Sequence, residues 1–244
     1  MKELARSQDP FGTVLVTDDG NRRYLSFGEE DEQSCILKSQ PSHPQYAFVR
    51  VMLLVLIYIE PKRALSFGLG AGSLNTALAG ACPSLKQQIV EIRQRVADYA
   101  HRYFYLPKSD SIDLIVADAA DFVEEPIAQR FDLIFSDLYT AQGLCDIQID
   151  DRFLQGCIER LRPKGWLVLN CWREHRADQV LDLLSKQFDY LFSATTQDGN
   201  WILFATNHMP DISQADYKRR AKELSERLGY SLLALSKRLK PVER

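Results

Sequence analysis

Three glycines at alternate positions, with a lone acid further along the chain, are the residues whose spacing points most directly to chemistry. Gly68, Gly70 and Gly72 follow the apolar run 64–67, and Glu91 ends a second apolar run. Glycine lets a chain turn sharply and approach a ligand closely, because no Cβ stands in the way. An acid at this distance can accept hydrogen bonds from both hydroxyls of a ribose. The pairing predicts a nucleoside cofactor across the carboxyl ends of two parallel strands.

The glycine spacing distinguishes between two kinds of cofactor. The pyrophosphate fingerprint of dinucleotide-binding proteins is Gly-x-Gly-x-x-Gly, whereas residues 68–72 have the form Gly-x-Gly-x-Gly. The tighter form, with no further glycine deeper in the following helix, fits a ligand without phosphates, such as S-adenosylmethionine, better than NAD. A dehydrogenase is therefore disfavoured.

Polar residues also end the later apolar runs. Asp118 follows the run 112–117, Asp137 follows the run 131–136, and Asn170 ends another. The carboxyl ends of parallel strands meet at one edge of a sheet, where ligands bind. A carboxylate beside a buried strand end is costly unless it has a partner. These positions therefore indicate a functional site.

The two aspartates have alternative roles. Asp118 can accept a hydrogen bond from an exocyclic amine such as adenine N6, and it can also N-cap a helix that begins at Ala119. Asp137 can orient or deprotonate an amine nucleophile, or it can be a structural cap. Tyr139 is more readily a wall of the pocket than a base, since its ordinary pKa is about 10.

The elements that must position these residues alternate between short apolar strands and amphipathic helices, which predicts an α/β fold with a parallel sheet. Strands are predicted at 64–68, 88–92, 112–117, 131–136 and 166–170, and helices at 73–81, 94–104, 119–124, 151–161 and 177–187. Two last strands, 190–195 and 201–206, form an antiparallel hairpin. We expect the Rossmann-like class I methyltransferase fold, a seven-stranded mixed sheet with a C-terminal antiparallel hairpin, preceded by a small N-terminal β region.

Three parts of the chain are expected. Residues 1–43 form a small N-terminal β-hairpin region, residues 44–210 a Rossmann-like cofactor-binding catalytic domain, and residues 211–244 a C-terminal amphipathic helix or helix pair. The hairpin strands are predicted at 13–17 and 22–26, with an extended piece at 34–38, and the apolar stretch 49–59 is predicted as a buried helix.

Composition restricts the class of function. A chain of 244 residues with 45% hydrophobic content can build one large domain with a substantial core. A net charge of -3 offers nothing global to attract nucleic acid or an anionic membrane. Scattered cysteines and histidines without ligand spacing predict a reduced, cytoplasmic protein that binds no metal. The exposed hairpin edge and the amphipathic tail favour a homodimer.

In the order of its motifs the sequence resembles the spermidine synthase (polyamine aminopropyltransferase) family, over roughly residues 11 to 206. The motifs that carry the resemblance are Glu32-Gln-Ser34, Phe67-Gly-Leu-Gly-Ala-Gly72, Ile89-Val-Glu-Ile92, Arg102-Tyr-Phe-Tyr-Leu-Pro107, Ala117-Asp-Ala119, Phe131-Asp-Leu-Ile-Phe-Ser-Asp137 and Leu161-Arg-Pro-Lys-Gly165. The resemblance implies a transferase that binds S-adenosylmethionine, its decarboxylated form or methylthioadenosine, together with a small acceptor, expected to be an amine.

The resemblance also implies residue roles. The acid at Glu91 holds the ribose, that at Asp118 meets the adenine, and that at Asp137 helps to deprotonate the attacking amine. Gln33 contacts the cofactor from the N-terminal region, and Tyr46 lines the pocket. The predicted cofactor-binding residues are Gln33, Gly68, Gly70, Gly72, Glu91, Asp118 and Ala119; the predicted catalytic residues are Asp137 and Tyr139, and the predicted substrate-binding residues are Tyr46 and Thr140.

Three departures from the family pattern leave the transferred group open. The acid within the family's Gly-Gly-Asp-Gly motif is Ala71 here, a Tyr-His-Glu-like segment is Ser42-His-Pro-Gln-Tyr46, and the second acid after the catalytic one is Thr140. A site for a polycation needs several carboxylates. Aminopropyl transfer is therefore weighed against a small-molecule methyltransferase and against a non-catalytic nucleoside-binding paralogue.

Overall fold

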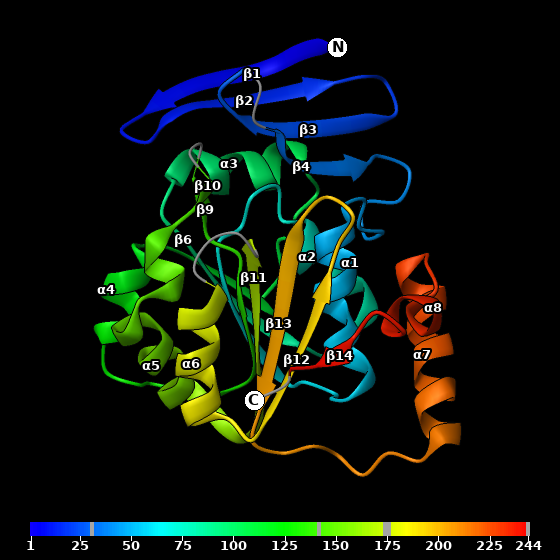
Figure 1. The fold of residues 1–244 in the computed structure, drawn as a ribbon. Coiled ribbons are helices and arrows are strands. Elements are labelled where there is room, and N and C mark those ends of the chain that lie inside the picture. Colours follow the sequence, from blue (N-terminus) through cyan, green and yellow to red (C-terminus); the bar gives the residue numbers. More distant parts are fainter. Residues whose placement is uncertain (30–31, 141–142, 173–176, 243–244) are drawn as a thin grey trace.

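A mixed eight-stranded sheet forms the centre of the computed structural model, which describes residues 1–29, 32–140, 143–172 and 177–242 (Figure 1). Its strands are β5 (Arg63–Phe67), β6 (Lys86–Glu91), β7 (Ile112–Val116), β8 (Phe131–Ser136), β11 (Leu161–Trp172), β12 (Tyr190–Thr195), β13 (Asn200–Thr206) and β14 (Lys240–Pro241). Across the sheet the order is β14-β12-β13-β11-β8-β5-β6-β7. The first five strands of the domain pair in parallel, and β13 is antiparallel to both β11 and β12.

This sheet confirms the predicted fold class. All seven predicted strands form within a few residues of their predicted bounds, and the two-residue β14 adds an eighth at the edge. The largest difference is β11, which begins at Leu161 instead of Trp166. The segment between these residues reads as a turn because it holds Pro163 and Gly165, and in the structure it is an irregularity in the pairing with β8.

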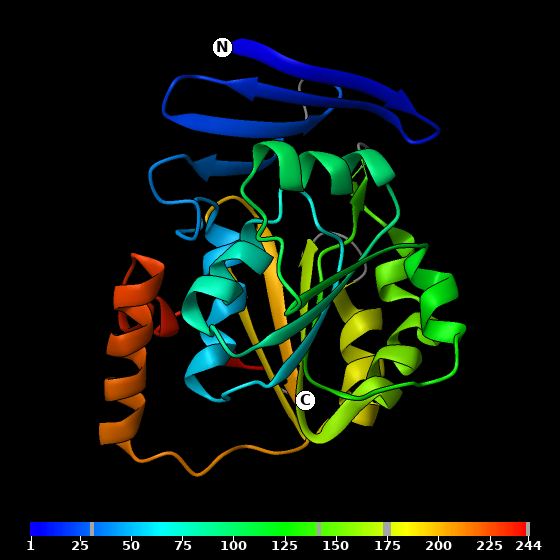
Figure 2. The same ribbon diagram turned by 180° about the vertical axis from the view of Figure 1, so that it is seen from behind.

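Helices cover both faces of the sheet (Figures 1 and 2). One face is covered by α1 (Ala47–Met52), the 3-10 helix η1 (Leu53–Ile57), α2 (Ser73–Ala81), α7 (Gln214–Leu228) and α8 (Leu232–Ser236). The other is covered by α4 (Ala119–Glu124), α5 (Asp151–Arg160) and α6 (Ala177–Gln187). Successive side chains of β11 alternate between the two cores: Trp166 and Val168 join the first, and Leu167 and Leu169 the second. A strand buried on both faces is apolar throughout, which is the pattern that predicted it.

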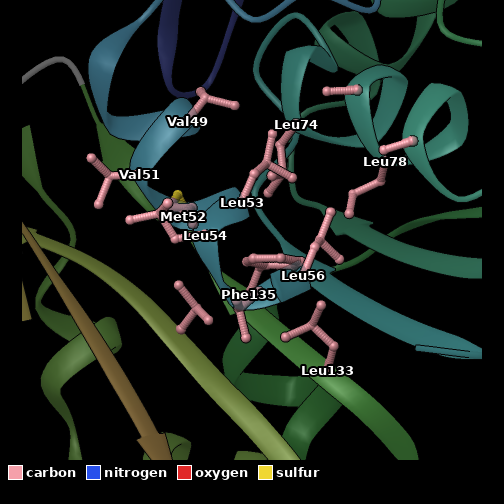
Figure 3. Close-up of a cluster of buried hydrophobic side chains, with 14 of the residues drawn as sticks. Val49, Val51, Met52, Leu53, Leu54, Leu56, Leu74, Leu78, Leu133 and Phe135 are labelled. Atoms are coloured by element: carbon pink, nitrogen blue, oxygen red, sulfur yellow. The ribbon is translucent and has the colours of Figure 1, made fainter. Parts of the chain in front are cut away.

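The first of these cores is built around the predicted buried helix (Figure 3). The apolar run forms α1 and continues as η1, and Leu53, Leu54 and Ile57 have no solvent exposure. Leu133 and Phe135 of β8 pack against this run. A helix that is apolar on all sides must be buried, and truncating one of these leucines to alanine costs about 2–5 kcal/mol of stability.

The N-terminal region is a four-stranded antiparallel sheet, larger than the predicted hairpin. It consists of β1 (Lys2–Asp9), β2 (Gly12–Asp18), β3 (Arg22–Phe27) and β4 (Glu32–Leu37), in that order. The predicted hairpin is β2 and β3, and the predicted extended piece is β4. Nothing in the sequence indicated β1, because this edge strand is mostly polar. The sheet packs on α3 (Gln94–Tyr103) and lies over the carboxyl ends of the parallel strands (Figure 1).

The predicted amphipathic tail is a helix pair, α7 and α8. Leu228 and Leu232 are fully buried against η1 and α2, so the apolar face of the tail covers the core. Gly229 ends α7 in a left-handed conformation with φ of 78°, which glycine adopts without strain. Residues 243–244 of the predicted tail lie outside the described residues. Of the helices that the structure describes, none is both long and apolar enough to cross a membrane.

The strand order positions the site. From β5 the chain continues to β6 and β7 on one side, and later returns to β8 and β11 on the other side. The loops that leave β5 and β8 therefore diverge, and a crevice opens outside their carboxyl ends.

Candidate active site

A cavity of about 470 Å³ lies at this crevice, between the carboxyl ends of the parallel strands and the N-terminal sheet. Every predicted site residue except Gly72 lines it. These lining residues are Gln33, Tyr46, Gly68, Gly70, Glu91, Asp118, Ala119, Asp137, Tyr139 and Thr140. Segments far apart in the sequence thus meet at one place, as the strand-end argument predicted.

The glycine loop is shaped by contacts within the protein. Gly68 has φ of 84°, and a Cβ there would lie 2.2 Å from the backbone oxygen of Asp137. Gly70 has φ of 53°, and its Cβ would lie 2.6 Å from Oγ of Ser34. We expected glycine for close approach to a ligand, but the atoms that exclude a side chain here belong to β4 and to the end of β8. Gly72, which precedes α2 with φ of 76°, faces Leu106 and lies outside the described cavity wall.

Glu91 ends β6 and is buried. Its Oε1 accepts a hydrogen bond from the backbone N–H of Arg93 at 2.9 Å, and its Oε2 accepts one from Leu69 at 3.0 Å. Burial raises the pKa of Glu91, and these two N–H donors oppose the rise. Each carboxylate oxygen has a second acceptor position, so Glu91 can accept hydroxyl hydrogen bonds from a ligand in the cavity that it lines.

Asp118 caps α4, which is one of its two predicted roles. Its Oδ1 accepts a hydrogen bond from the backbone N–H of Ala120 at 2.8 Å. The side chain is half-buried and lines the cavity, and the cap uses one of its two carboxylate oxygens. The contact with adenine stays a prediction. Ala119, the first residue of α4, lies buried beside it.

Asp137 follows β8 and is held by a chain of side-chain amides. Nδ2 of Asn170 donates to Oδ1 of Asp137 at 2.8 Å, and Nδ2 of Asn200 donates to Oδ1 of Asn170 at 3.1 Å. The second bond fixes the orientation of the Asn170 amide, so that its NH₂ group faces the carboxylate. Burial raises the pKa of Asp137 to about 6, against the lowering effect of the Asn170 hydrogen bond.

A buried glutamine fixes the two strand ends that carry this pair. Oε1 of Gln148 accepts hydrogen bonds from Oγ of Ser136 and from the N–H of Leu138, both at 2.8 Å. Its Nε2 donates to the carbonyl of Asn170 at 2.5 Å. Gln148 lies in the 3-10 helix η2 (Asp146–Ile149) and has no solvent exposure. Sequence reasoning missed Gln148 and Asn200, since neither ends a predicted strand.

The two tyrosines of the predicted site are engaged as neutral phenols. The Tyr139 hydroxyl donates to the carbonyl of Asn170 at 3.2 Å, and the Tyr46 hydroxyl donates to the Glu32 carboxylate. Burial raises the pKa of both tyrosines, and the neighbouring charge of Asp137 adds to the rise at Tyr139. A phenol that stays protonated suits a pocket wall better than a base.

The remaining predicted contacts come from the ends of short strands. Gln33 of β4 is half-buried. Thr140 lies in β9 (Tyr139–Thr140), which pairs with β10 (Gly143–Leu144), and its hydroxyl donates to the carbonyl of Gly143 at 3.3 Å. Ala71, in place of the family's acid, is fully buried and packs with α3 and the N-terminal sheet.

The charge of the cavity wall is predominantly negative. The acids that line it are Glu32, Glu91, Asp118 and Asp137. Among the described lining residues, Arg93 is the only basic side chain of the Lys or Arg type, and it forms a salt bridge with Asp9. Aromatic rings supply much of the rest of the wall, from Phe11, Phe27, Tyr46, Phe48, Tyr139 and Trp172. Within the described ranges no three His, Cys, Asp or Glu side chains are grouped as a metal site.

Sheet order, glycine loop and strand-end acids together define a Rossmann-like fold of the class I S-adenosylmethionine-dependent transferases. Comparison with solved structures agrees. A probable spermidine synthase from Corynebacterium glutamicum superposes with a TM-score of 0.77 at 18% identity, over 91% of this chain and 86% of that one. Human methyltransferase-like protein 13, solved with SAH, gives 0.61 at 24% identity, over 75% and 90%. A spermidine synthase solved with the transition state analogue AdoDATO gives 0.67 at 16% identity, over 97% and 87%.

Comparison with the sequences of curated proteins finds similar transferases. A polyamine aminopropyltransferase of Chromobacterium violaceum is 28% identical over 235 residues, which are 93% of this chain and 89% of that protein. The eEF1A lysine and N-terminal methyltransferase homolog of Drosophila melanogaster is 31% identical over 221 residues, 84% of this chain but 31% of that protein. No family model matches the sequence. These comparisons support a spermidine synthase-like family, because the chain is similar to the polyamine aminopropyltransferases over nearly its whole length.

Proposed function

We propose that the protein is an S-adenosylmethionine-dependent alkyltransferase that moves an aminopropyl or methyl group to the nitrogen of a small amine. The observation that carries the proposal is one cavity lined by a buried carboxylate, Glu91, and a half-buried one, Asp137. Glu91 lies at the end of β6, where a ribose can be held, and Asp137 lies at the end of β8, close to the amides of Asn170 and Asn200. The relatives named above, which are transferases, support the same class of reaction.

The sulfonium donor supplies an electrophilic carbon and a neutral thioether leaving group. The chain's own residues would align the acceptor amine for in-line attack, in which the N–C bond forms as the C–S bond breaks. Asp137, with a pKa of about 6, is ionised at neutral pH and can orient the amine and take up the proton that nitrogen releases. The half-buried position of Asp137 strengthens the attraction between this carboxylate and a cationic amine.

Aminopropyl transfer from decarboxylated S-adenosylmethionine is our first candidate. A cavity with four acids and several aromatic rings suits a donor and an acceptor that both carry ammonium groups. Methyl transfer from S-adenosylmethionine is the second candidate, and Ala71 favours it. That buried side chain leaves the glycine loop without the acid that, by resemblance, would hold an aminopropyl ammonium. A non-catalytic nucleoside-binding paralogue is the remaining alternative.

Several finer features belong to the same proposal. We propose a cytoplasmic protein without a bound metal, and the five free cysteines suit a reducing compartment. A homodimer is proposed because β1 is an edge strand, and an exposed edge is a site for pairing. The three-part division at 1–43, 44–210 and 211–244 and the residue roles predicted above are proposed with it, Tyr46 and Thr140 contacting the acceptor.

Donor binding and transfer can be tested separately. Calorimetric titration with S-adenosylmethionine, its decarboxylated form and methylthioadenosine would identify the donor. Each bound donor, isotopically labelled, is then incubated with a panel of primary amines and the products are identified by mass spectrometry. Tight binding of intact S-adenosylmethionine with none of the decarboxylated form would exclude aminopropyl transfer. Donor binding without product from any amine would favour the non-catalytic alternative, and no binding at all would overturn the proposal.

A further inference from the structure

An exposed aromatic ring faces the cavity from the N-terminal sheet. Phe11 lies in the turn between β1 and β2, is 52% exposed, and lines the cavity. Exposed phenyl rings are common on protein surfaces. The backbone that carries this ring is held by polar contacts from Asp9 and Arg93.

Asp9 holds the turn from inside. Its Oδ1 accepts a hydrogen bond from the backbone N–H of Phe11 at 2.9 Å. Gly12, which pairs with Asp9 across the two strands, has φ of 103°, a conformation that side chains rarely adopt. The backbone position of Phe11 is therefore set by the geometry of a single tight turn.

Arg93 locks the same turn to the main domain. Its guanidinium donates to both carboxylate oxygens of Asp9, at 3.0 and 2.8 Å, and to the carbonyl of Gly12 at 2.7 Å. It also lies over the ring of Phe27, with 4.5 Å between Cζ and the ring centroid, and 6.0 Å from that of Phe11. The Arg93 side chain is only 5% exposed. A bidentate guanidinium fixes direction as well as distance.

Arg93 belongs to the same segment as Glu91, the residue that is predicted to bind the ribose. Arg93 follows Glu91 by two residues and donates its backbone N–H to that carboxylate at 2.9 Å. Ile92, between them, is 39% exposed and lines the cavity. One short stretch of chain after β6 therefore sets the position of Glu91 and, through Asp9, that of Phe11.

We propose that Phe11 is a donor-binding residue whose ring packs on the nucleoside part of the donor, and that Arg93 is a positioning residue that acts through the turn. The inference rests on the proposed function, because it assumes a nucleoside at Glu91. Because the backbone of the turn is held before the ligand arrives, binding orders the Phe11 side chain alone and costs less conformational freedom than ordering a mobile loop. Its exposed half can then be covered by the ligand with a gain from apolar burial.

The test measures affinity for two nucleosides that share this part and differ beyond sulfur, methylthioadenosine and S-adenosylhomocysteine. Phe11→Ala is expected to weaken both by the same factor, about tenfold, or roughly 1.4 kcal/mol. Phe11→Trp keeps a flat ring and should retain most of the affinity, with a change in the emission of the new indole on binding. Tyr190→Ala, which removes a ring of 43% exposure on β12, away from the cavity, is the matched control and should change neither affinity.

Arg93 is tested by a double-mutant cycle. Arg93→Lys keeps the charge but loses the bidentate geometry, so it should weaken binding in the wild-type background and add little in the Phe11→Ala background. Equal losses in both backgrounds would contradict action through Phe11. The melting temperature of each unliganded variant shows whether folding is intact.

The outcomes separate this inference from the function on which it rests. If the wild type binds neither nucleoside, the proposed function fails and this inference fails with it. If the wild type binds and Phe11→Ala binds as well, only the role of Phe11 is overturned. A loss confined to S-adenosylhomocysteine would place the ring on the amino-acid tail, and would also contradict the proposal.

Discussion

Glu91 and Asp137, two of the four acids that line the cavity, are held in different ways. Glu91 accepts its two hydrogen bonds from backbone N–H groups of the glycine loop and of its own segment. Asp137 accepts from the side-chain amide of Asn170, which is in turn oriented by Asn200. The first carboxylate is thus fixed by the path of the chain and the second by replaceable side chains. Single side-chain substitutions can therefore remove the hydrogen bond to Asp137, whereas the backbone donors to Glu91 remain when side chains are replaced.

The largest effect is expected from removing the acceptor-side charge. Asp137→Asn should lower the rate of alkyl transfer about 100-fold or more, the range of a lost general base, while methylthioadenosine binding changes little. Steady-state rates with the preferred amine measure the first, and calorimetry the second. Asp121→Asn, which alters an exposed acid in the first turn of α4, is the control. An unchanged rate in Asp137→Asn would remove this residue from the chemistry.

The same substitution should stabilise the fold at high pH. The pKa of Asp137 rises from the ordinary 3.8 to about 6 on folding, so the native state holds its proton more tightly than the unfolded state. The charge therefore costs nothing below pH 3.8, and its cost grows as the pH rises to about 6. Asp137→Asn should gain about 1–3 kcal/mol over the wild type at pH 8, with no such pH-dependent gain at pH 4. Denaturant unfolding at both pH values gives the comparison, and an equal difference at both would refute the burial argument.

Removing the hydrogen bond from Asn170 to Asp137 should shift the pH profile of the transfer rate. Without the Asn170 donor the pKa of Asp137 rises above its present value of about 6, because that hydrogen bond favours the ionised form. Asn170→Leu should therefore move the acidic limb of the transfer rate to higher pH by about one unit, which corresponds to a tenfold loss on that limb. Donor affinity should hold. A profile that keeps its midpoint would show that the amide does not control the carboxylate.

Removing the hydrogen bond from Asn200 to Asn170 should have the smallest effect. Asn200→Leu leaves the Asn170 donor in place but frees its amide to turn, so the acidic limb should move in the same direction by a fraction of a unit. In the Asn170→Leu background the second substitution should add almost nothing. Additive shifts in the double variant would mean that Asn200 acts on Asp137 by a separate route.

Most of the fold could be predicted from the sequence, because a buried parallel sheet leaves a strong pattern. Short apolar runs such as 131–136, flanked by helical periods, are typical of buried strands. The strand β1 could not be found, since an edge strand with one exposed face needs little apolar sequence. The irregular start of β11 was also hidden, because a proline and a glycine within five residues read as a turn.

Only part of the candidate site could be predicted from the sequence. Glu91, Asp118 and Asp137 could be predicted because each ends an apolar run, and the fold brings such ends together. The contact of Asn200 with Asn170 could not be predicted, because it forms only where β13 pairs beside β11. The contact of Arg93 with Asp9 joins two sheets and leaves no local signal in the sequence.

Binding of methylthioadenosine to three proteins tests the central claim most directly, namely that a nucleoside is held at Glu91 in the cavity that Asp137 shares. Calorimetry should show that the wild type binds methylthioadenosine and that Glu91→Gln binds it with an affinity lower by about tenfold or more. The affinity of Asp137→Asn should equal that of the wild type. Absence of binding by the wild type, or equal affinity of Glu91→Gln and the wild type, would contradict the account.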